Sequence, residues 1–312
     1  MQQVTFGISW ILIKFMGLLP ESLIRRQISL IAWILRTCVK YRKKVLFQNL
    51  NRAFPDRPAD EIERIAKANY HILATTLVES LRGFTMKKSE VYERFQMENT
   101  HYLDRYYEKG QSVLLLSSHI GNWEFAALGL GLCLKHPVLG IYKPLSNPYL
   151  DKYVLRTRSN FGVHLIPVKK TQQAVFACRE NPGCLVLVAD QSPGKINKAI
   201  WSTLFGIPTP FVHGPEVIAK QNNWPVFYGD IQNTKPGHYT MKIEPLAEDP
   251  SSLPDGEITA RYAAKMESII RQNPADWLWT HRRWKRAGIH EMSEDEPSNA
   301  VASNAREFPE RK

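Results

Sequence analysis

The hydrophobic pattern changes within residues 112–132 from a short apolar run to a longer helical one. Val113–Leu116 is continuously apolar and is bounded by small polar residues, which is typical of a strand buried on both faces of a sheet. His119 follows, and an apolar pattern then resumes at helical density. Asn122 suits the N-cap of that helix, and Glu124 lies in its first turn, where a carboxylate is favoured. The pattern predicts a strand, a loop that carries His119, and a helix that places Glu124 opposite it.

Short apolar runs and helical patterns alternate along the rest of the chain. Strands are predicted at 138–142, 163–168, 184–190, 225–231 and 239–246. Helices are predicted at 60–82, 147–161, 171–180, 214–220 and 260–271, with a loop rich in Gly and Pro at 201–210. This order indicates an α/β fold with a mixed, largely parallel central sheet and helices on both faces. Functional sites in such sheets collect at the carboxyl ends of the strands, where His119 is expected.

The charge is concentrated near the start of the chain. A net charge of +11 indicates an anionic partner, such as nucleic acid, an anionic membrane surface or an anionic substrate. Between residues 14 and 52, nine Lys or Arg residues face a single acid, Glu21. Two apolar runs, 4–19 and 28–35, lie in or beside this segment, as in helices that rest on an anionic membrane. Core helices beneath a basic surface, or a single membrane span, are the alternatives.

Three regions follow from these patterns. Residues 1–40 are expected to form a membrane-associated helical segment, and 41–287 a single α/β domain. The tail, 288–312, is polar and has few large apolar residues, so it is expected to be disordered.

The spacing of His119 and Glu124 suits acid–base chemistry. A histidine acts as a general base near neutral pH when a carboxylate holds its second nitrogen and stabilises the imidazolium. His119 would take the proton of a substrate hydroxyl, and the alkoxide would attack an acyl carbonyl. Backbone amides near Gly121 and Asn122, together with a nearby cation, would bind the oxyanion. Taken alone, the H-x4-E spacing also fits a loop histidine beside a helix N-terminal acid, or a pair of metal ligands.

Further motifs occur in an order similar to that of a known family. They are YRKKVLFQNLNRAFPD (41–56), SSHIGNWE (117–124), YKPLSNPYLD with RTRSNFG (142–162), VADQSPG (188–194), LFGIPTPFVHGP (204–215) and WLWTHRRWK (277–285). Together they resemble the bacterial lipid A biosynthesis acyltransferases, which add secondary lauroyl or myristoyl chains, within the lysophospholipid acyltransferase superfamily. The resemblance covers roughly residues 5–286. It implies that 41–287 is an acyltransferase domain with a glycerol-3-phosphate-acyltransferase-like fold.

The resemblance also implies partners and roles. The donor would be an acyl chain on acyl carrier protein or coenzyme A, and the acceptor a hydroxyl of a phosphorylated glycolipid at the cytoplasmic face of the inner membrane. At the matching positions, His119 would be the base and Glu124 its orienting partner. Arg158 would contact the acceptor, with Arg156 as the second choice. No metal or redox cofactor is implied, and nucleic acid is not an expected partner.

Two further positions belong to the predicted substrate site. Asn122 lies inside the SSHIGNWE motif and is expected to shape its turn. Asp190 begins an Asp-Gln-Ser run where many relatives have Asp-His-Asp, so only Asp190 is expected to bind or position substrate.

Two alternative functions stay open. One is transfer to another membrane lipid, such as a lysophospholipid, glycolipid or aminolipid. The other is a non-catalytic protein that binds anionic membrane or nucleic acid. The segment WLWTHRRWKR (277–286) fits a membrane interface, a stacking surface for nucleic acid, or a packed C-terminal helix.

Overall fold

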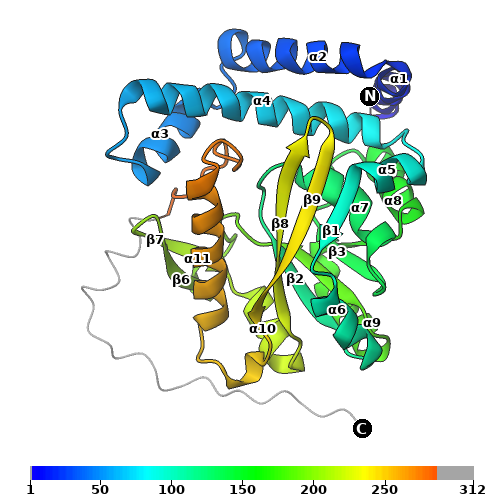
Figure 1. Cartoon of the computed structure of the whole chain (residues 1–312), viewed down its shortest axis with the longest axis vertical. Helices are drawn as coiled ribbons and strands as arrows, with labels where there is room; N and C mark the ends of the chain where they lie inside the picture. The colour runs from blue at the N-terminus through cyan, green and yellow to red at the C-terminus, as the bar shows by residue number, and fades with distance from the viewer. Residues whose placement is uncertain (1, 287–312) are drawn as a thin grey trace.

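A seven-stranded sheet forms the centre of the computed structural model, which describes residues 2–286 (Figure 1). The predicted tail, 288–312, lies outside the described residues. The strands of the sheet are Phe95–Glu98 (β1), Val113–Ser117 (β2), Val138–Tyr142 (β3), Val163–Pro167 (β4), Cys184–Val188 (β5), Val226–Lys235 (β8) and His238–Ala247 (β9). Their order is β1-β9-β8-β2-β5-β3-β4. From β8 to β4 all neighbours are parallel, whereas β9 is antiparallel to β8 and parallel to β1, which confirms the mixed, largely parallel sheet.

Helices cover both faces of the sheet, as predicted. The α-helices of residues 2–286, including two that lie outside these layers, are Gln2–Leu18 (α1), Glu21–Trp33 (α2), Lys43–Ala53 (α3), Ala59–Gly83 (α4), Lys88–Arg94 (α5), His101–Glu108 (α6), Trp123–Cys133 (α7), Pro148–Asn160 (α8), Thr171–Glu180 (α9), Gly214–Asn222 (α10) and Glu257–Gln272 (α11). Strand β2 shows why the sheet needs a layer of helices on each face. Leu114 and Leu116 join the core beneath α4, α9, α10 and α11, while Val113 and Leu115 join the core beneath α5, α6 and α7. Because neighbouring strand residues point to opposite faces, an entirely apolar strand must be covered on both.

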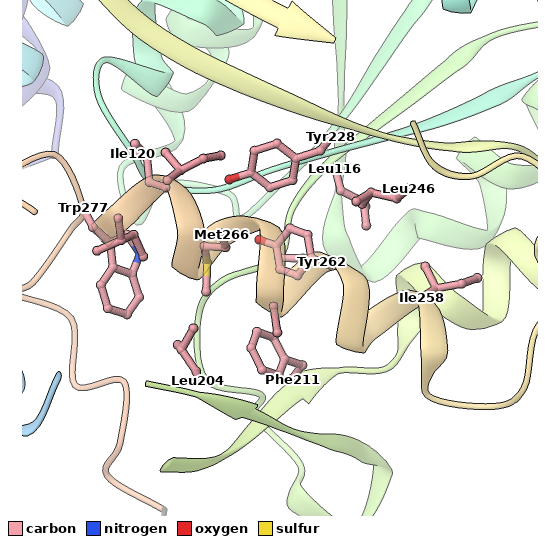
Figure 2. Close-up of a cluster of buried hydrophobic side chains, with 14 of the residues drawn as sticks. Leu116, Ile120, Leu204, Phe211, Tyr228, Leu246, Ile258, Tyr262, Met266 and Trp277 are labelled. Atoms are coloured by element: carbon pink, nitrogen blue, oxygen red, sulfur yellow. The ribbon is translucent and has the colours of Figure 1, made fainter. Parts of the chain in front are cut away.

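The larger core lies between the sheet, α11 and a separate hairpin. Figure 2 shows Tyr262 and Met266 of α11 between Tyr228 of β8 and the hairpin residues Leu204 and Phe211. This hairpin, Ala199–Leu204 (β6) and Ile207–Val212 (β7), occupies the region predicted as a loop.

The loop prediction for 201–210 is therefore wrong, and the reason lies in the prolines. Pro208 and Pro210 are in β7, which pairs with β6 alone. A two-stranded ribbon tolerates proline because each strand has a free edge. Phe205 and Gly206 both have positive φ, 55° and 74°, as the tight two-residue turns of hairpins require.

The C-terminal tryptophan segment is packed but is not helical. Trp277, Trp279 and Trp284 are buried, so of the three alternatives for this segment the structure supports the packed one, without the helix. Their irregular backbone is held by two helical side chains from far upstream. Asn69 of α4 donates to the carbonyls of Ala275 and Trp277, both at 2.7 Å, and Asn49 of α3 donates to the carbonyls of Trp279 and His281.

The N-terminal helices lie along the outer side of α4 (Figure 1). Helix α2 contacts α4, and α1 contacts both α4 and α8. Within residues 2–286, no helix combines the length and the apolar character needed to cross a membrane.

Candidate active site

His119 lies at the carboxyl edge of the sheet, immediately beyond β2, as the sequence predicted. The residues before it are fixed by buried hydroxyls. The Ser118 hydroxyl is 2.9 Å from the hydroxyl of Tyr228 and 3.0 Å from that of Tyr262. The carbonyl of His119 accepts from the amide of Leu278 at 3.0 Å. The histidine backbone is thus bound to the sheet, to α11 and to the C-terminal segment.

The partner of the imidazole is Asp190. Nδ1 of His119 is 2.6 Å from Oδ1 of Asp190, and the backbone amide of His119 donates to Oδ2 at 3.0 Å. The indole of Trp277 donates to the same Oδ2 at 2.8 Å. Asp190 follows β5, and β5 pairs directly with β2 in parallel, so the ends of the two strands bring aspartate and histidine together. The contact fixes a tautomer in which Nδ1 carries the proton and Nε2 has a free lone pair.

The two groups shift each other's proton affinity. Burial alone would lower the pKa of His119. The charge of Asp190, its hydrogen bond to Nδ1 and the charge of Glu124 outweigh burial, and the net pKa lies above the ordinary value of 6.5. Burial would likewise raise the pKa of Asp190, but the charge and hydrogen bonds of His119, with the Trp277 indole, lower it to about 2. Asp190 is therefore ionised at neutral pH and stabilises an imidazolium beside it.

The second ring nitrogen of His119 faces the accessible side of the site. The amide nitrogen of Gln191, an exposed residue, is 3.3 Å from Nε2. The ring packs edge-on against Trp123, with the ring centres 5.1 Å apart. The His119 side chain keeps 18% of its surface exposed, so a substrate hydroxyl that displaces Gln191 can reach Nε2.

Glu124 occupies a different position from the one predicted. It forms an ion pair with Arg158 of α8, and the hydroxyl of Ser80 lies 3.5 Å from the same carboxylate oxygen. The prediction that Glu124 orients His119 by direct contact is therefore wrong, because Asp190 makes that hydrogen bond. Arg158, which the resemblance assigns to the acceptor, is buried and its charge is matched by Glu124, and its contact with the acceptor stays a prediction. Arg156 is exposed and lies apart from this pair.

The turn between His119 and α7 is built around Asn122. Its side-chain oxygen accepts from the amide of Phe125 at 3.1 Å, which confirms the predicted N-cap. Its amide nitrogen donates to Glu79 at 2.7 Å and contacts the hydroxyl of Tyr239 at 3.1 Å. Asn122 is buried, and these contacts suit a residue that shapes the turn. The amide of Gly121, one of the predicted oxyanion donors, instead donates to the carbonyl of Asp276 at 3.0 Å.

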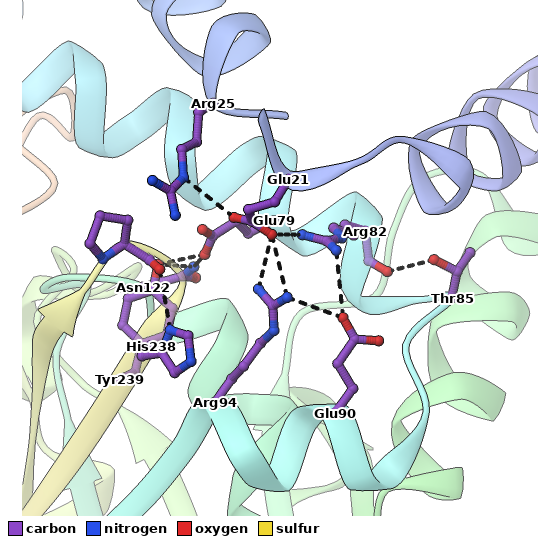
Figure 3. A network of polar contacts seen from close by, with 11 residues as sticks. Glu21, Arg25, Glu79, Arg82, Thr85, Glu90, Arg94, Asn122, His238 and Tyr239 are labelled. Atoms are coloured by element: carbon purple, nitrogen blue, oxygen red, sulfur yellow. Dashed lines mark hydrogen bonds and ion pairs between the residues drawn. The ribbon is translucent and has the colours of Figure 1, made fainter. Parts of the chain in front are cut away.

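A charged cluster beside Asn122 connects the N-terminal helices to the α/β domain (Figure 3). Glu21, at the start of α2, forms ion pairs with Arg82 of α4 and Arg94 of α5. Both arginines also pair with Glu90, at 3.5 and 3.3 Å. The single acid of the basic N-terminal segment therefore adds ion pairs to the apolar packing of α2 against α4.

The site contains two residues that the sequence did not single out for it. Trp277 reaches Asp190 from the C-terminal segment, and Glu79 reaches Asn122 from the middle of α4. Glu79 lies within an ordinary helical pattern, and no motif marks it. Only the folded structure shows that Glu79 is buried and accepts a hydrogen bond from Asn122.

Several known acyltransferases are similar to this chain in sequence. One relative is a lipid A biosynthesis acyltransferase of Haemophilus influenzae, 25% identical over 247 residues that cover 78% of each chain. A lipid A biosynthesis palmitoleoyltransferase of Escherichia coli is 23% identical over 290 residues, 92% of each chain. A phosphatidylinositol mannoside acyltransferase of Mycolicibacterium smegmatis is 23% identical over 246 residues, 77% of this chain and 78% of that one. The sequence model of the family described as bacterial lipid A biosynthesis acyltransferase matches residues 2–286. The chain, with its histidine at the end of a buried strand, therefore belongs to the bacterial lipid A biosynthesis acyltransferase family and is an O-acyltransferase.

Proposed function

We propose that this enzyme transfers a fatty acyl chain from acyl carrier protein, or from coenzyme A, to a hydroxyl of a lipid A precursor. The family and the names of two relatives support the acceptor. The observation that carries the mechanism is the environment of His119, whose Nδ1 is bound to Asp190 and whose Nε2 faces the accessible side. That arrangement is what a general base for a substrate hydroxyl requires.

In this mechanism His119 handles one proton. Nε2 takes the proton of the acceptor hydroxyl while the oxygen attacks the thioester carbonyl of the donor. The tetrahedral intermediate then expels the thiolate, which takes the proton from the imidazolium, so ester and free thiol leave a neutral histidine. Asp190 stays ionised and stabilises the imidazolium between the two steps.

Glu124 and Arg158 act as a unit in this proposal. The ion pair connects the first turn of α7 to the last turn of α8 and so holds both helices against the histidine loop. Glu124 also adds negative charge near His119, which favours the imidazolium. The first-turn amides of α7 are the donors that we assign to the oxyanion, since the amide of Gly121 is occupied.

We place the enzyme at the cytoplasmic face of the inner membrane, with α1 and α2 against the lipid. The apolar residues exposed on α1 include Val4, Ile8, Ile11, Phe15 and Leu18. The basic residues exposed on the segment that follows include Arg25, Arg26, Lys40, Lys43 and Lys44. Apolar side chains that insert shallowly, beside cations that attract anionic lipid, are typical of interfacial helices.

The decisive test replaces the base. His119→Ala should lower acyl transfer to a lipid A precursor by about 10²–10⁴-fold or more, since general base catalysis contributes an effect of that size. The exposed histidine of β4 provides a matched control, His164→Ala, which should keep the wild-type rate. Transfer is measured with purified full-length enzyme, acyl carrier protein loaded with a fatty acid, and mass spectrometry of the product. A folded His119→Ala enzyme with the wild-type rate would contradict the mechanism.

The similarity to a phosphatidylinositol mannoside acyltransferase supports a second candidate, acyl transfer to another membrane lipid. Mass spectra of total lipids from cells with and without the gene separate the two. Loss of an acyl chain from lipid A supports the first proposal. Unchanged lipid A, with a missing acyl chain on a different lipid, assigns that lipid as the acceptor.

A further inference from the structure

Glu79 of α4 is a buried carboxylate that faces the active-site turn (Figure 3). It is 6% exposed, and one of its oxygens accepts two hydrogen bonds, from the amide nitrogen of Asn122 at 2.7 Å and from the hydroxyl of Tyr239. Among residues 2–286 it forms no ion pair, although the charged cluster around Glu21 lies beside it. A buried carboxylate that the protein does not neutralise therefore binds the turn that follows His119.

The hydrogen bonds around Asn122 determine which way its side chain faces. Tyr239 donates its hydroxyl proton to Glu79, so the Tyr239 oxygen is left as an acceptor for Asn122. Both N–H groups of the Asn122 amide thus meet oxygens, one of Glu79 and one of Tyr239. The Asn122 oxygen is thereby turned toward the amide of Phe125, from which it accepts at 3.1 Å. The reversed amide would lose the helix cap and place oxygen against oxygen.

The cap determines how the first turn of α7 faces the reacting thioester. Asn122 takes the third amide of the helix, that of Phe125. Among residues 2–286, the first two amides, of Trp123 and Glu124, have no acceptor, so they are the ones that remain for the oxyanion. The same turn holds the ring of Trp123 edge-on against His119. A shift of the cap would therefore move both the oxyanion donors and a ring that contacts the base.

We propose that Glu79 is a positioning residue for acyl transfer, because it holds the Asn122 amide in the orientation that caps α7 and directs its first amides at the oxyanion. The proposal rests on the proposed function for the role of those amides, but not for the identity of the acceptor. The position requires an acceptor oxygen and not a charge, since both donors that reach Glu79 are neutral. Burial raises the pKa of Glu79, and the hydrogen bonds from Tyr239 and Asn122 offset only part of this rise.

Two substitutions of Glu79 separate the acceptor oxygen from the charge. Glu79→Gln keeps an oxygen for both donors and should keep kcat close to the wild-type value. Glu79→Leu removes that oxygen and should lower kcat by about 10–100-fold, since a displacement of roughly 1 Å at the reacting groups can cost that much. The KM values should change less than kcat, because the oxyanion exists only in the transition state and the intermediate. The kcat is measured with purified full-length enzyme, below the temperature at which each variant unfolds.

A matched control and a double variant identify the route of the effect. Glu90→Gln removes a carboxylate of the same charged cluster that pairs with Arg82 and Arg94, and it should keep kcat. Asn122→Ala should lower kcat about as much as Glu79→Leu does. Combining the two should lower kcat no further, because Glu79 acts through Asn122. Tyr239→Phe keeps the ring, removes one contact of the Asn122 amide, and should lower kcat by less, so the proposal can still be tested if Glu79→Leu does not fold.

Hydrogen exchange adds a readout that needs no substrate. Exchange of the Phe125 amide should speed up in Glu79→Leu and in Asn122→Ala, and should stay at the wild-type rate in Glu79→Gln and Glu90→Gln. The proposal is overturned if folded Glu79→Leu keeps the wild-type kcat, if Glu79→Gln loses as much as Glu79→Leu, or if the losses in the double variant multiply. If wild-type enzyme transfers no acyl chain to lipid A precursor while Phe125 exchange responds as expected, the positioning contact stands and the proposed acceptor falls.

Discussion

Arg158 and Arg156 lie two residues apart on α8 and have opposite environments. Arg158 is 8% exposed and is neutralised by Glu124. Arg156 is exposed and lines a surface cavity of about 280 Å³ beside α8, with no carboxylate among the lining residues. The comparison teaches that position in a motif does not assign a role to an arginine. A charge that the protein already matches holds elements in place, and an unmatched charge at a cavity is available to a ligand.

The same contrast separates the histidine from its surroundings. Asp190 is buried, ionised and matched by His119 and Trp277, so its charge is fixed before any substrate arrives. A preorganised charge of this kind stabilises a developing imidazolium without rearrangement. Removing a charge that the protein already matches should therefore reduce catalysis or stability. Removing an unmatched charge should reduce the affinity for a ligand.

The largest effect is expected for Asp190→Asn. Loss of the carboxylate should lower kcat by about 10²–10⁴-fold, because the base loses the group that fixes its tautomer and its charge. The pKa of His119 should also fall, because burial, which lowers it, remains after the charge that raises it has gone. The base is active when neutral, so the acid limb of the pH–rate profile should move to lower pH while the plateau drops. The pH dependence of kcat checks this, and an unmoved acid limb would show that Asp190 does not control the proton affinity of His119.

Arg158→Met should have the next largest effect, on stability as well as rate. Removing one partner of a buried ion pair costs about 3–5 kcal/mol, and Glu124, with 32% of its side chain exposed, should bring the loss below that range. The measurement is a denaturant unfolding curve for Arg158→Met, Glu124→Gln and the double variant. The double variant should lose less than the sum of the single variants. If the losses of unfolding free energy in the two single variants simply added up in the double variant, the ion pair would make no net contribution to stability.

Trp277→Phe should have a smaller effect. The substitution keeps an aromatic ring in the core but removes the indole donor to Asp190, which should cost about 1.5–3 kcal/mol of unfolding free energy. Because that hydrogen bond lowers the pKa of Asp190, the pKa should rise in the variant. Trp284→Phe is the matched control for a donor to a neutral group, since its indole donates to the hydroxyl of Thr209. A larger loss of unfolding free energy in Trp284→Phe than in Trp277→Phe would show that the charge on Asp190 does not determine the cost of losing the indole hydrogen bond.

Much of the fold was predictable because local patterns determine it. The strands β2, β3, β4, β5, β8 and β9 are apolar runs of the right length, and each was predicted within a few residues. Strand β1 was missed because FQME is short and half polar, and it is held by pairing with the distant β9. The C-terminal segment was missed for a similar reason, since Asn49 and Asn69 bind its backbone from more than 200 residues away.

The site was predictable in part. The strand–loop–helix pattern placed His119 correctly, because a buried strand that ends in a polar loop has its carboxyl end at the sheet edge. The pattern could not choose between two acids. Glu124 is five residues from the histidine and Asp190 is 71 residues away, yet Asp190 is in contact because β5 lies beside β2. Strand order depends on how all the layers pack, and it is not encoded in the hydrophobic pattern of any one segment.

The smallest effect on stability is expected for Arg156→Met, and it is the sharpest test of the comparison with Arg158. Exposed residues without partners usually change the unfolding free energy by no more than about 0.5 kcal/mol, so the unfolding curve should overlay that of the wild type. If Arg156 contacts the acceptor, the second choice that the family resemblance gives, the KM for the acceptor should nevertheless rise and the KM for the acyl donor should not. Steady-state kinetics with each substrate varied in turn, beside the unfolding curves of Arg156→Met and Arg158→Met, provide the measurement. If both arginine variants lost stability equally and neither changed the acceptor KM, burial and pairing would not distinguish the two side chains, and the roles assigned to them here would be wrong.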